Sequence, residues 1–288
     1  MKPIEDCTVG IVGLGLMGGA IAMALRNRCG VTRNKLHACD IDAETLALAE
    51  ESGLIAKGWK ADENLSEMLG GCDLVFLCLR PSAVSGFIEK WGFAFKSGAL
   101  VTDIAGNKKN IATAAETFRS DVDFIPGHPM AGAEKGGFAN AGLCDFQGKN
   151  YILTPLARNN HENLEFLKDL IRRMGFSRIT EVTPCEHDRK IAFTSQLCHL
   201  IASALIDCEA DAAITRFGGG SFEDLTRIAM IDAPLWTELF IGNRDALLER
   251  LESFTASLNT LQALIRSGNA DELEKRLALV RERRTAMA

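Results

Sequence analysis

Gly13-Leu14-Gly15-Leu16-Met17-Gly18-Gly19 is the stretch of sequence that decides the fold. An apolar run over residues 7–12 precedes it and is typical of a buried β-strand, and a helical pattern over residues 20–26 follows it. Strand, glycine-rich turn and helix in this order form the βαβ unit that binds a dinucleotide. We therefore expect a nucleotide-binding domain in the first part of the chain.

The positions within this stretch have distinct tasks in such a unit. Gly13 permits the tight turn, Gly15 lets the backbone approach the pyrophosphate, and Gly18 lets the helix pack closely on the strand. Leu16 and Met17 begin the helix, whose first N–H groups can bind the pyrophosphate, so they join the expected cofactor contacts. The alternative is that the glycines only shape a tightly packed turn.

An acidic residue stands where such a domain holds the ribose. A second β-like run, residues 35–39, ends in Asp40, about twenty residues after the last glycine, where a carboxylate can accept hydrogen bonds from ribose hydroxyls. No arginine follows closely, so a 2′-phosphate would be repelled at this position. The sequence thus favours NAD over NADP as the cofactor.

Two further apolar runs, residues 74–79 and 100–103, alternate with helical patterns. Continuous apolar strands separated by helices predict an α/β fold, with a Rossmann-type, doubly wound parallel sheet covered on both faces. Arg80, Pro81 and Asp103 lie at the ends of these strands and are expected to line the nicotinamide side of the cofactor crevice.

Smaller features follow in the same half of the chain. Lys108 and Lys109 could bind an anion near the crevice, but lysines on the solvated surface are the more common interpretation. Strand-like segments at residues 151–154 and 177–182 flank a helical pattern over residues 161–174 and are expected to complete the sheet.

The segment Gly127-His128-Pro129-Met130-Ala131-Gly132 follows another apolar run, residues 122–125. A histidine that a strand end delivers onto a loop stiffened by proline and glycine is held in place and stays partly open to solvent, which suits proton transfer near neutral pH. His128 is therefore the first candidate for a catalytic residue. The alternative is a turn whose histidine merely caps a strand.

The character of the chain changes at Thr183. From there on the apolar residues follow only helical periods, and Thr183-Pro184-Cys185-Glu186 forms a capping box with proline at the first helical position. We place a domain boundary here, which gives an NAD-binding Rossmann domain over residues 1–182 and an all-α domain over residues 183–288.

Polar residues of the helical half are candidates for a binding pocket. Ser195 and His199 share one helix face, which either lines a polar pocket or holds a core histidine that a neighbouring carbonyl satisfies. Arg227 stands among apolar neighbours, where a guanidinium meets either a substrate carboxylate or an acid of the protein. His187 is expected to be a structural partner and not a catalyst, and Trp236 either walls a pocket or packs.

Apolar residues over 244–266 alternate spacings of four and three, which predicts a helix with a heptad seam. Such a seam packs either within the helical domain or against a second copy of the chain. We expect a homodimer, by analogy with two-domain oxidoreductases whose helical half lies between subunits.

The composition of the 288 residues argues against several classes of protein. A hydrophobic share of 47% and a charged share of 24% are those of an ordinary globular protein. A net charge of −6 without a basic stretch argues against nucleic acid as a partner. The nine cysteines show no C-x-x-C pair, so neither a disulfide framework nor a metal site is expected. No signal peptide or membrane span is recognisable, so we expect a cytoplasmic protein that binds no membrane.

These motifs together resemble the prephenate/arogenate dehydrogenase family of tyrosine biosynthesis. The resemblance spans nearly the whole chain, and it rests on the glycine-rich turn, Val101-Thr102-Asp103, the His128 segment with Glu134-Lys135, Glu186-His187-Asp188 and Thr226-Arg227-Ile228-Ala229. It implies a Rossmann domain followed by a helical dimerisation domain, with a small-molecule substrate held between them. It also implies NAD-dependent oxidative decarboxylation of prephenate to 4-hydroxyphenylpyruvate.

The resemblance further implies roles for individual residues. His128 matches the catalytic histidine that acts as general base on the ring hydroxyl, and Arg227 matches the arginine that holds the ring carboxylate. The other positions that match the family's substrate pocket are His199, Ser195, Gly220, Trp236 and Glu134.

Three positions depart from the family's pattern. Gly106 stands where many relatives have serine, Gln196 where histidine is common, and Glu223 where a basic residue is common. The last change removes positive charge near the expected pocket and leaves open arogenate, whose side chain carries an ammonium group, as the substrate.

Two other functions compete with this interpretation. A β-hydroxyacid dehydrogenase of the 6-phosphogluconate type shares the glycine-rich turn, but it relies on a lysine in the region where this chain has His128. A non-catalytic NAD-sensing dimer would explain the first domain, but it would leave His128, His199 and Arg227 without a task.

Overall fold

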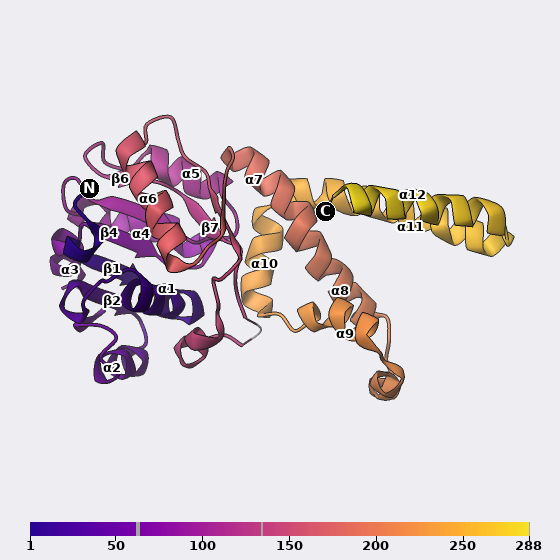
Figure 1. Ribbon diagram of the computed structural model, residues 1–288, viewed down its shortest axis with the longest axis horizontal. Helices are drawn as coiled ribbons and strands as arrows, with labels where there is room; N and C mark the ends of the chain where they lie inside the picture. The colour runs from indigo at the N-terminus through magenta and orange to yellow at the C-terminus, as the bar shows by residue number, and fades with distance from the viewer. Residues whose placement is uncertain (62–63, 134, 288) are drawn as a thin grey trace.

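The computed structural model describes residues 1–61, 64–133 and 135–287. Figure 1 shows strands β1 to β7 and their helices gathered in one body, from which the helices of the C-terminal half extend. In the described chain, β9 ends at Glu181 and the regular elements after it are helices. Short 3₁₀ helices lie at Ile4–Asp6, Arg33–Lys35, Gly92–Ala94, Phe138–Leu143, Ala212–Phe217 and Arg227–Ala229.

A six-stranded sheet forms the centre of the first body. Its strands run parallel in the order β3-β2-β1-β4-β5-β6. Their bounds are Val9–Val12 (β1), Leu36–Asp40 (β2), Lys57–Lys60 (β3), Leu74–Leu77 (β4), Leu100–Asp103 (β5) and Asp123–Phe124 (β6). The chain order reverses between β1 and β4, where sheets of this type bind a dinucleotide beyond the carboxyl ends of the strands. The predicted Rossmann-type sheet is confirmed.

Helices cover both faces of this sheet, and each face has its own apolar core. The core that includes Ile11 and Leu25 packs under α1 (Leu16–Arg28), α2 (Ala43–Glu51) and α6 (His161–Met174). The core that includes Val75 packs under α3 (Leu65–Gly71), α4 (Pro81–Trp91) and α5 (Lys109–Glu116). Local sequence sets the helix ends: the Asn160 side chain caps α6, and Gly175, with a φ of 116°, ends it.

A second, three-stranded sheet contains β7 (Gly127–Pro129), β8 (Asn150–Leu153) and β9 (Arg178–Glu181). β7 pairs antiparallel with β8, which places His128 opposite Ile152, and β8 pairs parallel with β9. The prediction that the later strands complete the main sheet is therefore wrong, because β6 ends that sheet after two residues and β8 pairs with β7 instead. His128 accordingly lies within a short strand and not on a loop.

A long run of helix opens the second half of the chain. α7 (Pro184–Ile191) begins where Glu186 N donates a hydrogen bond to Thr183 Oγ1 at 3.2 Å, as the capping box predicts. It continues through a π-helical segment, Ala192–Gln196, into α8 (Leu197–Asp207). The remaining helices are α9 (Gly220–Thr226), α10 (Ala233–Gly242), α11 (Arg244–Ser267) and α12 (Ala270–Ala286), and the last two form a hairpin that projects from the molecule (Figure 1).

The helical half buries little of its own surface. The fully buried members of both apolar cores precede Ser177. From α8 onward, the buried apolar residues in the described chain are Leu197, Ala202 and Leu247, whereas large side chains such as Phe217 are exposed. Among the described residues, every helix is too short or too polar to cross a lipid bilayer.

Candidate active site

The glycine-rich turn between β1 and α1 has the shape that a bound dinucleotide requires. Gly13 has a φ of 91°, and a Cβ at this position would overlap the carbonyl oxygen of Cys78. A Cβ on Gly18 would overlap the carbonyl oxygen of Gly13, so that only glycine allows α1 to begin so close to the strand. Gly15 is exposed, with no atom within 4 Å of the Cβ position, and it begins α1 without a side-chain cap. The partly exposed Leu16 and Met17 follow it, so the first N–H groups of α1 have no side-chain cap from Gly15 and can serve a ligand.

Asp40 lies beside this turn because β2 is the neighbour of β1. Its carboxylate accepts hydrogen bonds from Leu14 N at 2.5 Å and from Asp42 N at 2.9 Å, and the side chain is only partly buried. Each carboxylate oxygen retains further lone-pair capacity, which a ribose hydroxyl can use. The turn and Asp40 therefore fit a dinucleotide as the sequence predicts.

Arg80 and Pro81 lie at the start of α4, beyond the carboxyl end of β4. Arg80 is exposed and lies 3.9 Å from Asp232, which precedes α10 in the helical half. Pro81 occupies the first turn of α4, where its missing N–H costs no helix hydrogen bond. That both residues border the nicotinamide half of the crevice stays a prediction.

Asp103 has a different position from the one expected of a cofactor contact. Its fully buried carboxylate accepts hydrogen bonds from Lys108 Nζ at 2.5 Å, Ala105 N at 2.8 Å and Gly127 N at 3.2 Å. The Asp103 carboxylate thus connects β7 to the loop after β5. Its acceptor positions are occupied by groups of the protein, so the side chain is not placed as a cofactor contact. The interpretation of Lys108 as a solvated lysine is wrong as well, because this side chain is fully buried and paired.

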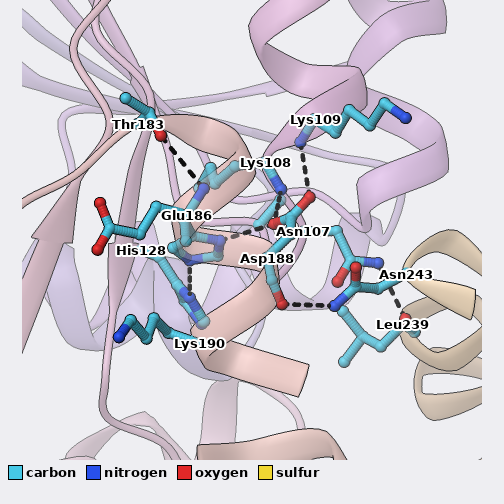
Figure 2. A network of polar contacts seen from close by, with 12 residues as sticks. Asn107, Lys108, Lys109, His128, Thr183, Glu186, Asp188, Lys190, Leu239 and Asn243 are labelled. Atoms are coloured by element: carbon cyan, nitrogen blue, oxygen red, sulfur yellow. Dashed lines mark hydrogen bonds and ion pairs between the residues drawn. The ribbon is translucent and has the colours of Figure 1, made fainter. Parts of the chain in front are cut away.

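His128 is the first member of a chain of three polar side chains. Its Nδ1 lies 2.9 Å from Nε2 of His187, and Nδ1 of His187 lies 2.7 Å from Oδ1 of Asp188. Oδ1 and Oδ2 of Asp188 accept hydrogen bonds from Lys108 N at 2.8 Å and Lys109 N at 2.9 Å, at the beginning of α5 (Figure 2). The catalytic candidate from β7 therefore contacts His187 of α7, which in turn contacts Asp188, the next residue of the same helix.

This environment keeps His128 neutral. Burial lowers the pKa of His128 well below its ordinary value of 6.5, and the charges of His187 and Lys108 act in the same direction. Burial also lowers the pKa of His187, against the opposing effect of Asp188. A neutral imidazole at pH 7 has a lone pair that can accept a proton.

Two carboxylates of the helical half cap helices of the Rossmann body. Asp188 occupies the N-terminus of α5, and Glu238 of α10 accepts hydrogen bonds from Ser82 Oγ at 2.9 Å and Ser82 N at 3.3 Å at the N-terminus of α4. Carboxylates are favourable at helix N-termini because the first N–H groups and the helix dipole are positive. The helical half is thus attached at the two helices that follow β4 and β5.

A ladder of side-chain amides strengthens this attachment. Gln196 Nε2 donates to Asn107 Oδ1 at 2.9 Å, and Asn243 Nδ2 donates to Gln196 Oε1 at 2.8 Å. Asn107 and Gln196 also donate to the carbonyl oxygen of Leu239, and Asn243 donates to that of Asp188 (Figure 2). Gln196, the residue at a position where histidine is expected, thus forms hydrogen bonds with Asn107, Leu239 and Asn243. Sequence patterns gave no signal for Asn107 or Asn243.

Leu239 also lies close to the glycine at position 106. A Cβ on Gly106 would lie 2.8 Å from Leu239 Cδ2 and 3.8 Å from His128 Nε2. Any side chain at this position would have to displace the leucine. Where many relatives have serine, this chain therefore has Gly106 with the apolar side chain of Leu239 beside it.

His199 and Trp236 form a second cluster in the helical half. Their rings stack at a centroid distance of 3.7 Å and an interplanar angle of 30°. His199 Nδ1 lies 3.0 Å from the carbonyl oxygen of the partly buried Ser195. Burial lowers the pKa of His199, the Ser195 carbonyl opposes this shift, and the charge of Arg227 adds to it. The 3₁₀ helix that begins with Arg227 packs against α8, the helix of His199.

α10 connects this cluster to the catalytic candidate. Trp236 and Leu239 are three residues apart on α10, so they share one face, and Leu239 reaches Gly106 beside His128. α10 thus places Leu239 beside Gly106, next to His128, and Trp236 against His199. Gly220 begins α9 and is exposed, with no atom within 4 Å of a Cβ position, and Glu223 of the same helix is exposed as well. Glu134 lies outside the described residues.

Comparison with known families decides the classification. The family model "Prephenate dehydrogenase, nucleotide-binding domain" matches residues 21–180, and "Prephenate dehydrogenase, dimerization domain" matches residues 183–279. The chain belongs to the prephenate dehydrogenase family. The resemblance noted in the sequence is confirmed.

Individual members of the family are similar along most of their length. The prephenate dehydrogenase of Bacillus subtilis is 27% identical over 280 residues, which are 95% of this chain and 74% of the relative. The crystal structure of prephenate dehydrogenase from A. aeolicus, in complex with hydroxyphenyl propionate and NAD⁺, has a TM-score of 0.85 at 29% identity and covers 97% of this chain and 98% of its own. The arogenate dehydrogenase of Synechocystis has a TM-score of 0.78 at 29% identity, with 97% and 99% covered.

Proposed function

We propose that this chain is an NAD-dependent dehydrogenase that converts prephenate to 4-hydroxyphenylpyruvate with loss of carbon dioxide. The observation that carries the proposal is the position of His128 beside Gly106, in the loop after β5 of the Rossmann sheet, where α10 approaches with Leu239 while Trp236 of the same helix stacks on His199. Two similar proteins support the substrate, since one is a prephenate dehydrogenase and the other was crystallised with hydroxyphenyl propionate and NAD⁺.

NAD fits the turn between β1 and α1. Gly13, Gly15 and Gly18 leave room for its pyrophosphate on the N–H groups of Leu16 and Met17, and Asp40 would hold the adenosine ribose. Arg80 and Pro81 border the nicotinamide half. The chemistry that bound NAD supplies is acceptance of a hydride from the ring carbon that carries the hydroxyl group.

His128 accepts the proton that the hydroxyl group of the substrate loses. As the hydroxyl carbon loses its hydride, the hydroxyl oxygen gives its proton to the imidazole. The bond to the ring carboxylate breaks, carbon dioxide leaves, and the electron pair of that bond makes the ring aromatic. The phenol oxygen then takes a proton back, so the reaction releases no net proton.

The second cluster would orient the substrate. Arg227 supplies a planar cation for the ring carboxylate, and His199, stacked on Trp236, supplies a polar edge to the same pocket. Ser195, Gly220 and Glu134 are proposed as further pocket positions because they match the family's pattern. Arogenate is the second candidate substrate, and the exposed Glu223 on α9 favours it by its charge.

A spectrophotometric assay tests the function. Purified protein is mixed with NAD and either prephenate or arogenate, and reduced nicotinamide is followed by its absorbance. We expect turnover with prephenate that exceeds turnover with arogenate. A higher kcat/KM for arogenate would assign the second substrate, and no turnover with either would refute the proposed function.

Replacing Arg227 with alanine should weaken substrate binding. Loss of a charge-assisted hydrogen bond to a carboxylate costs about 1.5–3 kcal/mol, so KM for prephenate should rise about 10- to 100-fold. Steady-state kinetics measure this effect. Arg266→Ala is the matched control, since it removes an exposed arginine at the far end of α11. An unchanged KM in Arg227→Ala would remove the guanidinium from the pocket.

The chain is also proposed to form a homodimer through its helical domain, residues 183–288, with the Rossmann domain over residues 1–182. Support comes from the apolar side chains that the helical half leaves exposed, including Leu258 and Ile265 of the heptad seam in α11. Burial of such surface stabilises association. Light scattering should give twice the mass of one chain, and a monomer at micromolar concentration would contradict this. A cytoplasmic location is proposed from the use of NAD in biosynthesis.

A further inference from the structure

The helical domain does more at the active site than cover the substrate. His128 comes from β7 of the Rossmann body, but the two residues behind it, His187 and Asp188, come from α7. Four contacts connect His128, His187, Asp188 and the backbone N–H groups that bind Asp188, and for each of them the donor and the acceptor can be assigned. Together they determine which nitrogen of His128 carries the hydrogen.

The carboxylate of Asp188 ends this series of hydrogen-bonded side chains, and the Rossmann body holds it in place. The backbone N–H groups of Lys108 and Lys109 can only donate, and each points at one oxygen of the carboxylate, at 2.8 and 2.9 Å. Asp188 is therefore an acceptor on both oxygens, and its orientation is locked by the Rossmann body.

The orientation of Asp188 decides the tautomer of His187. A carboxylate accepts, so Nδ1 of His187, 2.7 Å from Oδ1, must carry a hydrogen. The imidazole is fully buried and burial lowers its pKa, so its other nitrogen carries no hydrogen at neutral pH. Nε2 of His187 is consequently an acceptor.

The tautomer of His187 in turn decides the tautomer of His128, the proposed catalytic base. Nδ1 of His128, 2.9 Å from this acceptor, must donate, which leaves the lone pair of His128 on Nε2. Nε2 is the nitrogen that lies on the side of Gly106, 3.8 Å from where a Cβ of residue 106 would be. It lies beyond the carboxyl end of β5, on the side where the nicotinamide is expected.

We propose that His187 and Asp188 are positioning residues that fix His128 as the Nδ1–H tautomer, so that only Nε2 can accept the substrate's proton. The opposite tautomer would present an N–H to the hydroxyl group and could not act as a base. Docking of the helical domain against α5 then becomes a condition for catalysis, although it is no condition for NAD binding. The role in catalysis rests on the proposed function, whereas the tautomer itself does not.

Nitrogen NMR of the imidazoles tests the tautomer without substrate. The chain has five histidines, so the side-chain spectrum of ¹⁵N-labelled protein is simple, and His128→Gln identifies the His128 signals. We expect a protonated Nδ1 and an unprotonated Nε2 in the wild-type chain. In Asp188→Asn, whose amide can donate to His187, we expect signals of His128 shifted toward the opposite tautomer. A wild-type Nε2–H, or an unchanged tautomer in Asp188→Asn, would overturn the proposal.

Kinetics provide the second arm. Asp188→Asn and His187→Gln should lower kcat by about 10²-fold or more, as expected when a general base is held in the wrong tautomer, while KM and the affinity for reduced NAD stay unchanged. His187→Gln removes the link but keeps Asp188 on α5, so it covers the case in which Asp188→Asn does not fold. His161→Gln is the control, because this histidine is exposed on α6.

The two arms separate the possible failures. No turnover by the wild-type chain with either substrate, together with the expected nitrogen signals, would refute the proposed function and leave the positioning role intact. A rise in KM with an unchanged kcat in His187→Gln would instead assign His187 and Asp188 to substrate binding and overturn the proposal.

Discussion

Replacing His128 with asparagine is expected to lower kcat about 10²- to 10⁴-fold, the range that a positioned general base contributes. Asparagine keeps a polar side chain of similar size in β7, but it has no nitrogen lone pair that can take a proton. The affinity for reduced NAD, measured by fluorescence titration, should remain that of the wild-type chain, because the glycine-rich turn that would bind the cofactor follows β1 and not β7.

His161→Asn is the matched control for this variant. His161 begins α6, and its side chain is 85% exposed. We expect wild-type kcat and KM from it. If His128→Asn retains the activity of the control, the proton is taken by another group and His128 has no part in the chemistry.

Replacing Lys108 with methionine should have the largest effect on stability. Lys108 Nζ and Asp103 Oδ2 lie 2.5 Å apart, and both side chains are completely buried. Methionine preserves much of the volume, but it leaves the carboxylate without its cation, and breaking a buried pair in this way costs about 3–5 kcal/mol. Urea denaturation at a fixed protein concentration, followed by circular dichroism, measures the loss.

The neighbouring residue provides the control for this effect. Lys109 carries the same side chain one position later but is exposed, so Lys109→Met should change the free energy of unfolding by less than about 0.5 kcal/mol. The double variant Asp103→Asn with Lys108→Met should be more stable than Lys108→Met alone, because the unpaired charge is gone. Equal stability of the two single lysine variants would show that the buried pair contributes nothing.

Much of the Rossmann body was predictable because its signals are local. The glycine-rich turn, the acid that ends β2 and the apolar runs of β4 and β5 each occupy a few consecutive residues, and the structure confirms the parallel sheet they predict. β3 and α3 were not predicted. β3 reads Lys57-Gly58-Trp59-Lys60 at the edge of the sheet, where only Trp59 is buried, so it lacks the apolar run of a central strand.

The errors have a common physical cause. Asp103 and Lys108 are ordinary surface residues by type, and their burial depends on the closure of the loop after β5 over the strand end. The pairing of β8 with β7 depends on which strand edge is open, which an apolar pattern does not specify. Sequence motifs thus located the residues but not their partners.

The site shows the same division between single residues and their contacts. His128 was singled out by its segment, and the expectation that His187 is a structural partner agrees with its contact to His128. Asn107, Asn243 and Leu239 were missed, because amides and a leucine in separate helices and loops give no signal until the fold brings them together. The roles of the pocket residues remain predictions.

The π-helical segment at Ala192–Gln196 carries one extra residue in its turn compared with an α-helix. A residue added to a regular α-helix would rotate everything that follows by about 100° around the helix axis, but the wider π turn absorbs this rotation. His187, before the segment, meets β7, and His199, after it, meets α10. Deletion of a single residue within this segment is therefore expected to restore a regular α-helical turn in which His187 still faces β7 and His199 still faces α10, so the π turn adds a residue to this helix without changing the angle between the two imidazoles.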